Sequence, residues 1–402
     1  MVTADPNSGV TSPSAPPGNG LLVVFAAMTP EQLEGAFANL TASFPHEELI
    51  IASPDAILDA FATDAHPLFR IVPAPASHSA WNITAADFVS AYQLADKHKA
   101  RAVLMLGPEC GSLDSSSLRK LSDAVLGSAD SIDLAVPCYE LSPHAGLVNS
   151  AILYPLTRAL FASSVRFPLA VDLGLSLRMA KRMADAALHF TAINQGETPL
   201  WPVNEATIAG FAIDQFNVGP SVQSAGPDLN TIFPLVIGPL FADINAKATF
   251  WQRFRPLPPV HNAVPMPLAL IPDSATDIAP MLSAFRLAYT NLHEIWSLVL
   301  PPNSLLSLKR LTITDTPAFR ISDSLWARIV YDFLLAYRLR TINRGHLLGA
   351  LIPLYLAWVA SHLNITASGS DSEEHIEAVA AAFETEKTYM VSRWRWPDRF
   401  NP

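Results

Sequence analysis

One carboxylate stands where an apolar run ends, about a quarter of the way along the chain. Residues 103–106 read Val-Leu-Met-Leu, which is the composition of a buried strand, and Gly107, Pro108 and Glu109 follow them. A protein site for Mg²⁺ usually combines one or two carboxylates with phosphate oxygens of the substrate. The Glu109 carboxylate supplies an oxygen donor of the type that such sites use.

Strands and helices alternate through the first part of the chain, and this alternation positions the Glu109 loop. Helical patterns, one of them capped by Thr84, separate apolar runs of strand length at residues 21–26, 49–52, 69–72, 102–106 and 132–136. The alternation predicts an α/β fold with a mostly parallel sheet covered by helices on both faces. Such sheets bind ligands beyond the carboxyl ends of their strands, where Gly107 and Glu109 are expected.

Proline content marks a boundary after this part. Six prolines fall between residues 254 and 275, where they remove backbone donors and disfavour helix. Beyond them the pattern predicts four helices, at residues 281–300, 322–340, 343–363 and 373–394. We therefore predict a disordered tail at 1–20, an α/β domain at 21–253, a proline-rich linker at 254–275 and an all-helical domain at 276–402.

One segment of the helical part is apolar enough to suggest a membrane helix. Residues 347–363 are about 17 residues long, which is the short limit for crossing a bilayer. They contain Pro353, and Arg344 and His346 precede them. We expect a buried helix and no membrane span. The apolar surface of these helices also leaves a homo-oligomer open.

The composition excludes several classes of protein. Of the 402 residues, 50% are hydrophobic and 15% are charged, as in globular proteins. The formal net charge is −10 and no run of basic residues occurs, which argues against a nucleic-acid partner. Cys110 and Cys138 are too few for a disulfide framework and lack zinc-site spacing, so we expect a cytoplasmic location.

The short catalytic motifs are absent from the sequence. It has no glycine-rich phosphate loop, no HExxH and no GxSxG, the nearest match being residues 174–178, which lack the closing glycine. Longer patterns carry more information. Residues 149–176, 210–241 and 325–395 resemble, in the same order, bacterial family 2 (GT-A) glycosyltransferases of the glucosyl-3-phosphoglycerate synthase and mannosylglycerate synthase type. This resemblance implies a GT-A domain and the transfer of a sugar from a nucleotide-sugar to a small polar or phosphorylated acceptor.

The resemblance also assigns a nucleotide and metal site, in altered form. The family's Asp-x-Asp falls on residues 107–109, so Gly107 replaces the first acid and Glu109 can serve as the second. A metal-binding His of the family falls on Gln223, and Asp55 is the acid that remains in the early donor-binding loops. The implied cofactor is Mg²⁺ or Mn²⁺. Glu109 as a solvated loop acid, and Gln223 as a loop amide bonded to backbone, are the structural alternatives.

The acceptor side is altered as well. The family's Gly-Gly-acid-Phe-Gly loop falls on residues 170–174, which leaves Asp172 as the implied catalytic or acceptor-orienting acid, or as a helix cap. Its Gly-Ile-Asp-Ile-Trp motif falls on residues 197–201, with Pro199 where the acid belongs. Arg344 and His346 can contact phosphate or serve helix packing.

Two functions follow from these patterns. The first is sugar transfer, with Glu109 helping to hold a metal-diphosphate and Asp172 orienting the acceptor. The second is a catalytically degenerate homologue that binds a sugar-nucleotide or an active partner protein. An unrelated α/β enzyme of small molecules is a third interpretation.

Overall fold

The structure is a computed structural model that describes residues 20–54, 68–127, 132–220, 228–253 and 277–397. The predicted tail up to residue 19, the whole proline-rich linker, Asp55 and Gln223 lie outside these residues, so those predictions stay open.

Within the described residues, seven strands form one sheet in the order β3-β2-β1-β4-β6-β5-β7. β6 runs antiparallel to β4 and β5, and the other pairs are parallel. The α/β class and the mostly parallel sheet are therefore confirmed. The strands are β1 Leu21–Phe25, β2 Leu49–Ser53, β3 Phe69–Pro73, β4 Ala102–Leu106, β5 Leu134–Glu140, β6 Leu173–Ser176 and β7 Ile213–Pro220.

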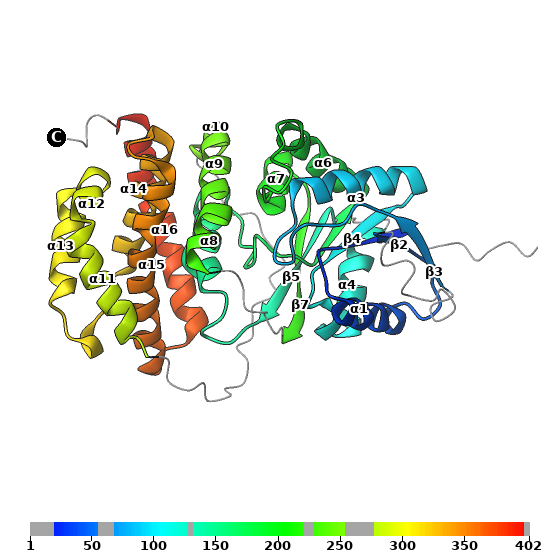
Figure 1. The fold of residues 1–402 in the computed structure, drawn as a ribbon, viewed down its shortest axis with the longest axis horizontal. Coiled ribbons are helices and arrows are strands. Elements are labelled where there is room, and N and C mark those ends of the chain that lie inside the picture. The colour runs from blue at the N-terminus through cyan, green and yellow to red at the C-terminus, as the bar shows by residue number, and fades with distance from the viewer. Residues whose placement is uncertain (1–19, 55–67, 128–131, 221–227, 254–276, 398–402) are drawn as a thin grey trace, which may run out of the picture.

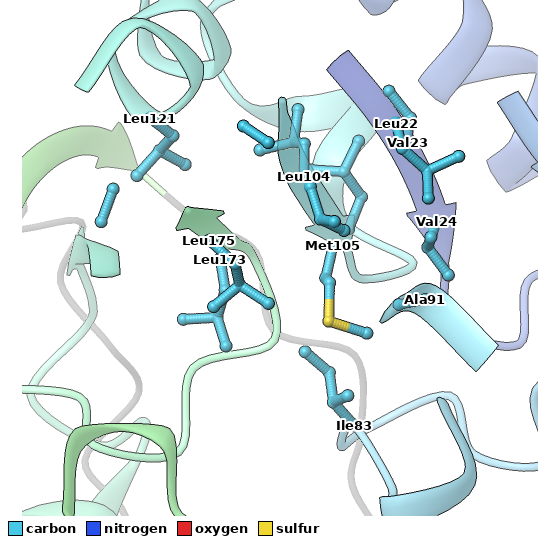
Figure 2. Close-up of a cluster of buried hydrophobic side chains, with 14 of the residues drawn as sticks. Leu22, Val23, Val24, Ile83, Ala91, Leu104, Met105, Leu121, Leu173 and Leu175 are labelled. Carbon is cyan, nitrogen blue, oxygen red and sulfur yellow. The ribbon is translucent and has the colours of Figure 1, made fainter. Parts of the chain in front are cut away.

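The central strands are continuous apolar runs because helices cover both of their faces. Val23, Leu104 and Leu175, on three adjacent strands, are fully buried, and Met105 points from β4 toward Ile83 (Figure 2). A strand that is buried on both faces gains from apolar residues at every position, so it shows no polar alternation. This rigid centre fixes the carboxyl end of β4, where the Glu109 loop begins.

Helices on the two faces come from the segments between the strands. α1 and α4 cover one face, and α3, α6 and α7 cover the other (Figure 1). Thr84 caps α3, as predicted, by accepting a hydrogen bond from the Asp87 backbone N–H. These helices are α1 Pro30–Ser43, α3 Ala85–His98, α4 Ser115–Leu126, α5 Tyr154–Phe161, α6 Leu177–Ala192 and α7 Pro202–Ala209, with short turns η2 Cys110–Ser112 and η3 Asn149–Leu153.

The rest of the described chain is helical, and the predicted helical region is confirmed. The expectation of four helices beyond residue 276 was wrong, because residues 281–300 form two helices that break at Leu292, and α13 begins at Pro302, a residue suited to a first helical turn. The elements are α8 Leu229–Ile232, η4 Phe233–Ile237, α9 Gly238–Ala246, α10 Ala248–Trp251, α11 Ala279–Asn291, α12 His293–Val299, α13 Pro302–Thr312, η5 Thr316–Ala318, α14 Asp323–Leu339, α15 Arg344–Ala367 and α16 Ser372–Arg395.

A second hydrophobic core divides the chain differently from the predicted boundary at residue 253. Residues of α5, η4 and α9 pack in one cluster with α11–α16; Phe161, Phe241 and Trp326 are all fully buried in it. The first core holds the sheet and its covering helices. The helical body therefore includes α5, which lies between β5 and β6 in the sequence, and also η4 and α9, which precede residue 253. The predicted domain boundary assigned these segments to the α/β domain.

Two helical segments are long and apolar enough by composition to cross a membrane, residues 229–246 and 344–367. Buried helices of protein cores meet the same criterion, and 67% of the apolar window in α15 is buried within the protein. Leu347, Leu351 and Leu354 of α15 are fully buried. The apolar character of α15 is thus explained by its packing against its neighbours.

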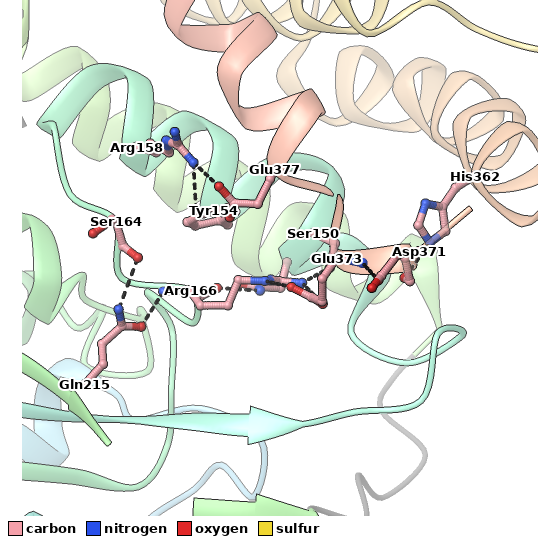
Figure 3. A network of polar contacts seen from close by, with 12 residues as sticks. Ser150, Tyr154, Arg158, Ser164, Arg166, Gln215, His362, Asp371, Glu373 and Glu377 are labelled. Atoms are coloured by element: carbon pink, nitrogen blue, oxygen red, sulfur yellow. Dashed lines mark hydrogen bonds and ion pairs between the residues drawn. The ribbon is translucent and has the colours of Figure 1, made fainter. Parts of the chain in front are cut away.

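A polar network joins the helical body to the sheet (Figure 3). Arg166 lies before β6, and its Nε and Nη2 donate to the two carboxylate oxygens of Glu373 on α16, each at 3.0 Å. Nη2 also donates to the Ser150 hydroxyl at 3.0 Å, and the Arg166 backbone N–H donates to Gln215 on β7 at 2.7 Å. The buried guanidinium of Arg166 therefore connects α16 and η3, and its backbone N–H connects the same residue to the sheet.

Candidate functional site

Asp172 lies directly before β6, at the carboxyl edge of the parallel strands. Its Oδ1 accepts a hydrogen bond from the Gly107 backbone N–H at 2.9 Å, and its Oδ2 accepts one from the Tyr139 hydroxyl at 2.6 Å. The residue is only 5% exposed. Burial raises the pKa of Asp172, although the hydrogen bonds from Tyr139 and Gly107 offset part of the effect. The carboxyl group thus joins β4, β5 and β6 and uses both oxygens within the protein.

The helix-cap alternative for Asp172 is wrong. Ser176 caps α6, because its side chain accepts a hydrogen bond from the Met179 backbone N–H at 3.2 Å. Four residues separate Asp172 from that helix end. Its contacts instead hold the Gly107 loop.

Val171 fills the space beside Gly107. A Cβ atom at position 107 would lie 2.9 Å from Val171 Cγ1 and 3.0 Å from Val171 Cβ. Such separations are far shorter than the 3.5–4.0 Å at which carbon atoms pack. The loop therefore accepts only glycine at this position while Val171 keeps its place. Gly107 and Val171 are therefore complementary in size in this structure.

Glu109 is half-buried and directly precedes η2. Its backbone oxygen accepts hydrogen bonds from the Ser112 backbone N–H at 2.9 Å and the Ser112 hydroxyl at 2.7 Å. Its charge is one of the causes that raise the pKa of Asp172, so the two predicted acids lie in one neighbourhood. Their proposed roles in binding and catalysis remain predictions.

These residues fit a divalent metal poorly. Across the residues that the structure describes, no group of three or more His, Cys, Asp or Glu side chains is arranged to hold a metal ion. Asp172 is buried and engaged, which leaves Glu109 as one carboxylate beside a glycine that Val171 covers. Mg²⁺ needs near-octahedral oxygen ligands, and one carboxylate is the lower limit of what proteins supply.

A cleft of 1360 Å³ lies elsewhere, between helices of the sheet region and helices of the helical body. One wall comes from α6, the loop at residues 193–201 and the start of α7, and the other from η4 and α9 with Tyr337 and Arg344. Gly107, Glu109 and Asp172 are not among the residues that line it. The predicted site residues and this cleft are thus distinct features.

Most charges in this cleft are paired with one another. Glu205 of α7 accepts from Arg182 Nη2 and from Lys247 Nζ, each at 2.7 Å. Lys247 also pairs with Asp243 of α9, whose Oδ2 accepts from Asn204 at 2.9 Å. Burial raises the pKa of Glu205, but the cations Lys247 and Arg182 outweigh burial and hold it below its ordinary value. This network ties α6 and α7 to α9 at the cleft wall.

Two groups in the cleft keep unused hydrogen-bonding capacity. Arg344 stacks over the ring of Tyr337 at 4.1 Å, and its Nε donates to the Tyr337 backbone oxygen at 3.4 Å. In the described residues it has no ion pair with a carboxylate. Trp201 is 2% exposed, and its indole N–H has no acceptor among the described residues. The cleft therefore contains a cation and a buried donor.

Some of the residues that line the cleft belong to segments that the sequence resemblance includes. The structure brings residues 197–201, which the resemblance aligns with a family motif, onto the same cleft as Arg344. Arg182, Glu205 and Lys247 were missed. Arg182 and Glu205 lie on α6 and α7 and Lys247 directly follows α9, and no spacing or motif distinguishes them from ordinary surface charges.

No family model and no curated protein matches the chain. Among solved structures it is similar to glucosyl-3-phosphoglycerate synthase from Mycobacterium tuberculosis in complex with phosphoglyceric acid, at 17% identity and a TM-score of 0.35, covering 55% of this chain and 78% of that chain. The same enzyme in complex with Mn²⁺, UDP-glucose and phosphoglyceric acid gives 17% identity, a TM-score of 0.34 and the same coverage. A structure described as a mycobacterial protein gives 15% and 0.33, covering 55% and 74%. At these values the likeness identifies no substrate in this chain.

Proposed function

We propose that this chain is a glycosyltransferase-like protein that binds a nucleotide-sugar in the cleft and does not carry out metal-dependent sugar transfer. The observation that carries the proposal is the position of Val171 over Gly107. The collinear motifs of the sequence supply the ligand class, and the changed residues supply the loss of the reaction.

Sugar transfer from a nucleotide-sugar develops negative charge on the leaving diphosphate. A metal ion that bridges it stabilises the transition state by several kcal/mol, and about 1.4 kcal/mol is a factor of ten in rate. Glu109 alone can hold a metal only weakly, and Val171 prevents a second acid at position 107. Transfer through such a site would be slower by orders of magnitude.

The contacts of Asp172 also disfavour transfer. An acid that orients an acceptor hydroxyl must present an oxygen to the substrate at about 2.6–3.2 Å. Both oxygens of Asp172 are already within hydrogen-bonding distance of Tyr139 and Gly107. Its role here is to hold three strands together.

Calorimetry with UDP-glucose and a GDP-sugar, with and without Mn²⁺ or Mg²⁺, tests the proposal. We expect binding whose affinity does not depend on the metal. Incubation with UDP-glucose and phosphoglyceric acid, which are named in the neighbouring structures, is expected to give no glucosylated product. Turnover, or affinity that rises steeply with Mn²⁺, would contradict it.

A further inference from the structure

Arg344 is set apart from the other cations of the cleft by its surroundings. Arg182 and Lys247 are neutralised by Glu205 and Asp243. Arg344 instead lies over the ring of Tyr337, and within the described residues one of its five N–H donors bonds a backbone oxygen. Stacking on an aromatic ring orients a guanidinium without consuming its outer N–H groups, which are the ones that bind phosphate in pairs.

The position of Arg344 in its helix adds to its suitability for an anion. Arg344 is the first residue of α15, a helix of 24 residues. Asn343 caps the helix by accepting from the backbone N–H groups of Gly345 at 2.9 Å and His346 at 3.3 Å. Because the cap uses these groups, the helix contributes the positive end of its dipole and the guanidinium supplies the direct contacts.

Trp201 is the second, independent feature. Its ring is 98% shielded from solvent, and its indole N–H has no acceptor in the described residues although it lines the same cleft. A buried donor without a partner is unfavourable, and a ligand oxygen that accepted from it would remove this cost. The cleft therefore offers a cation for phosphate, and its wall contains an indole N–H that makes no hydrogen bond within the described residues.

We propose that Arg344 binds the phosphate groups of the ligand in this cleft, and so provides the positive charge that the altered Gly107 loop does not. The ligand class is a diphosphate, either inorganic or as part of a nucleotide. The inference rests on the proposed function only for the nucleotide part of the ligand. Glu197 on the opposite loop also lines the cleft, and its negative charge sets a limit on phosphate affinity.

The test compares Arg344→Gln with the wild-type protein by calorimetry, using phosphate, pyrophosphate, UDP and UDP-glucose without metal. We expect wild type to bind pyrophosphate and UDP, and Arg344→Gln to bind them roughly ten- to a hundredfold more weakly, as for the loss of paired charge-assisted hydrogen bonds. Arg344→Lys should fall between the two, because lysine cannot stack or bind in a fork. Thermal melting shows whether each variant is folded.

Three further variants test the sign and the location of the effect. Arg340→Gln removes the same charge from an exposed residue that does not line the cleft, and it should change affinity less than twofold. Glu197→Gln should strengthen pyrophosphate binding, because it removes a repelling carboxylate. Trp201→Phe should weaken UDP-glucose binding severalfold, since the unpartnered N–H is lost.

The outcomes separate this inference from the proposed function. Pyrophosphate binding that depends on Arg344, without binding of any nucleotide-sugar, would support Arg344 and contradict the proposed ligand. UDP-glucose binding that is equal in wild type and Arg344→Gln would overturn the inference and leave the proposed function standing. Absence of binding to phosphate, pyrophosphate and UDP in the wild type would overturn the inference as well.

Discussion

The Cγ1 methyl of Val171 lies 2.9 Å from the point that a Cβ atom at Gly107 would occupy, across a span of 64 residues in the chain. Position 107 follows β4 and position 171 precedes β6, and these strands pair. A side chain at one of the two positions therefore excludes a side chain at the other. This exclusion decides whether the loop can hold a second acid.

The pair can be tested by a double-mutant cycle. Gly107→Asp is expected to destabilise the fold by about 1–3 kcal/mol, because the new side chain overlaps Val171. Val171→Gly creates a cavity and is destabilising by itself, but the double variant should be more stable than the sum of the two changes predicts. Denaturant titration of the four proteins measures this coupling. Additive effects would show that the two positions do not compete for space.

The same variants test the ancestry of the loop. Mn²⁺ binding, followed by calorimetry in the presence of UDP, is expected in the double variant and not in Gly107→Asp alone. The reason is that the acid at position 107 can reach its ligand geometry only after Val171 is removed. Absence of Mn²⁺ binding in a folded double variant would count against residues 107–109 as a former metal site.

Tyr139→Phe should destabilise the protein although it removes a single oxygen atom. The hydroxyl donates to Asp172 Oδ2 at 2.6 Å, and without it a buried carboxylate keeps one oxygen unsatisfied. Leaving such a group unpaired costs about 1–3 kcal/mol. Tyr92→Phe, on the half-buried face of α3, is the matched control and should change stability little. If both variants lose the same stability, the loss in Tyr139→Phe does not come from the hydrogen bond to Asp172.

Stability should fall when the pH is lowered from about 6.5 to about 4, because of His362. Burial, and then the charge of His375 at a Nδ1–Nδ1 distance of 2.7 Å, lower the pKa of His362 from 6.5 to about 4. In this window the unfolded chain binds a proton that the folded protein excludes, so the His362 contribution is complete above pH 6.5 and declines below it. The total change is on the order of 3 kcal/mol.

Denaturant titration between pH 4 and pH 7.5 measures this slope. His362→Gln should flatten it, whereas His46→Gln, at an exposed position, should leave it unchanged. A slope that persists in folded His362→Gln would assign the pH dependence to other groups.

Glu373→Gln should loosen the contact between α16 and the sheet. The substitution leaves the Arg166 guanidinium, whose side chain is 5% exposed, without its bidentate partner. Breaking a buried pair on one side costs roughly 3–5 kcal/mol, and the exposure of Glu373 places the expected loss at the lower end. Glu374→Gln, the exposed neighbour on the same turn, is the control for a change of one charge. Hydrogen exchange of α16 should accelerate in the first variant only.

The sequence by itself determined the local elements and the order of the layers. β4 was predicted to the residue, and Thr84 was identified as the cap of α3, because strand runs and helix caps depend on neighbours in sequence. Alternating strands and helices then required a mostly parallel sheet. The break at Leu292 was not visible, since both halves of that segment have a helical pattern.

Only the tertiary structure decided which residues meet. Val171 lies beside Gly107, although 64 positions separate them in the sequence. Trp201 and Arg344 are 143 positions apart and line the same cleft. Periodicity and motif spacing carry no information about such contacts, because they arise when separate elements pack side by side. For the same reason nothing in the sequence indicated that the carboxyl group of Asp172 lies between Tyr139 and Gly107.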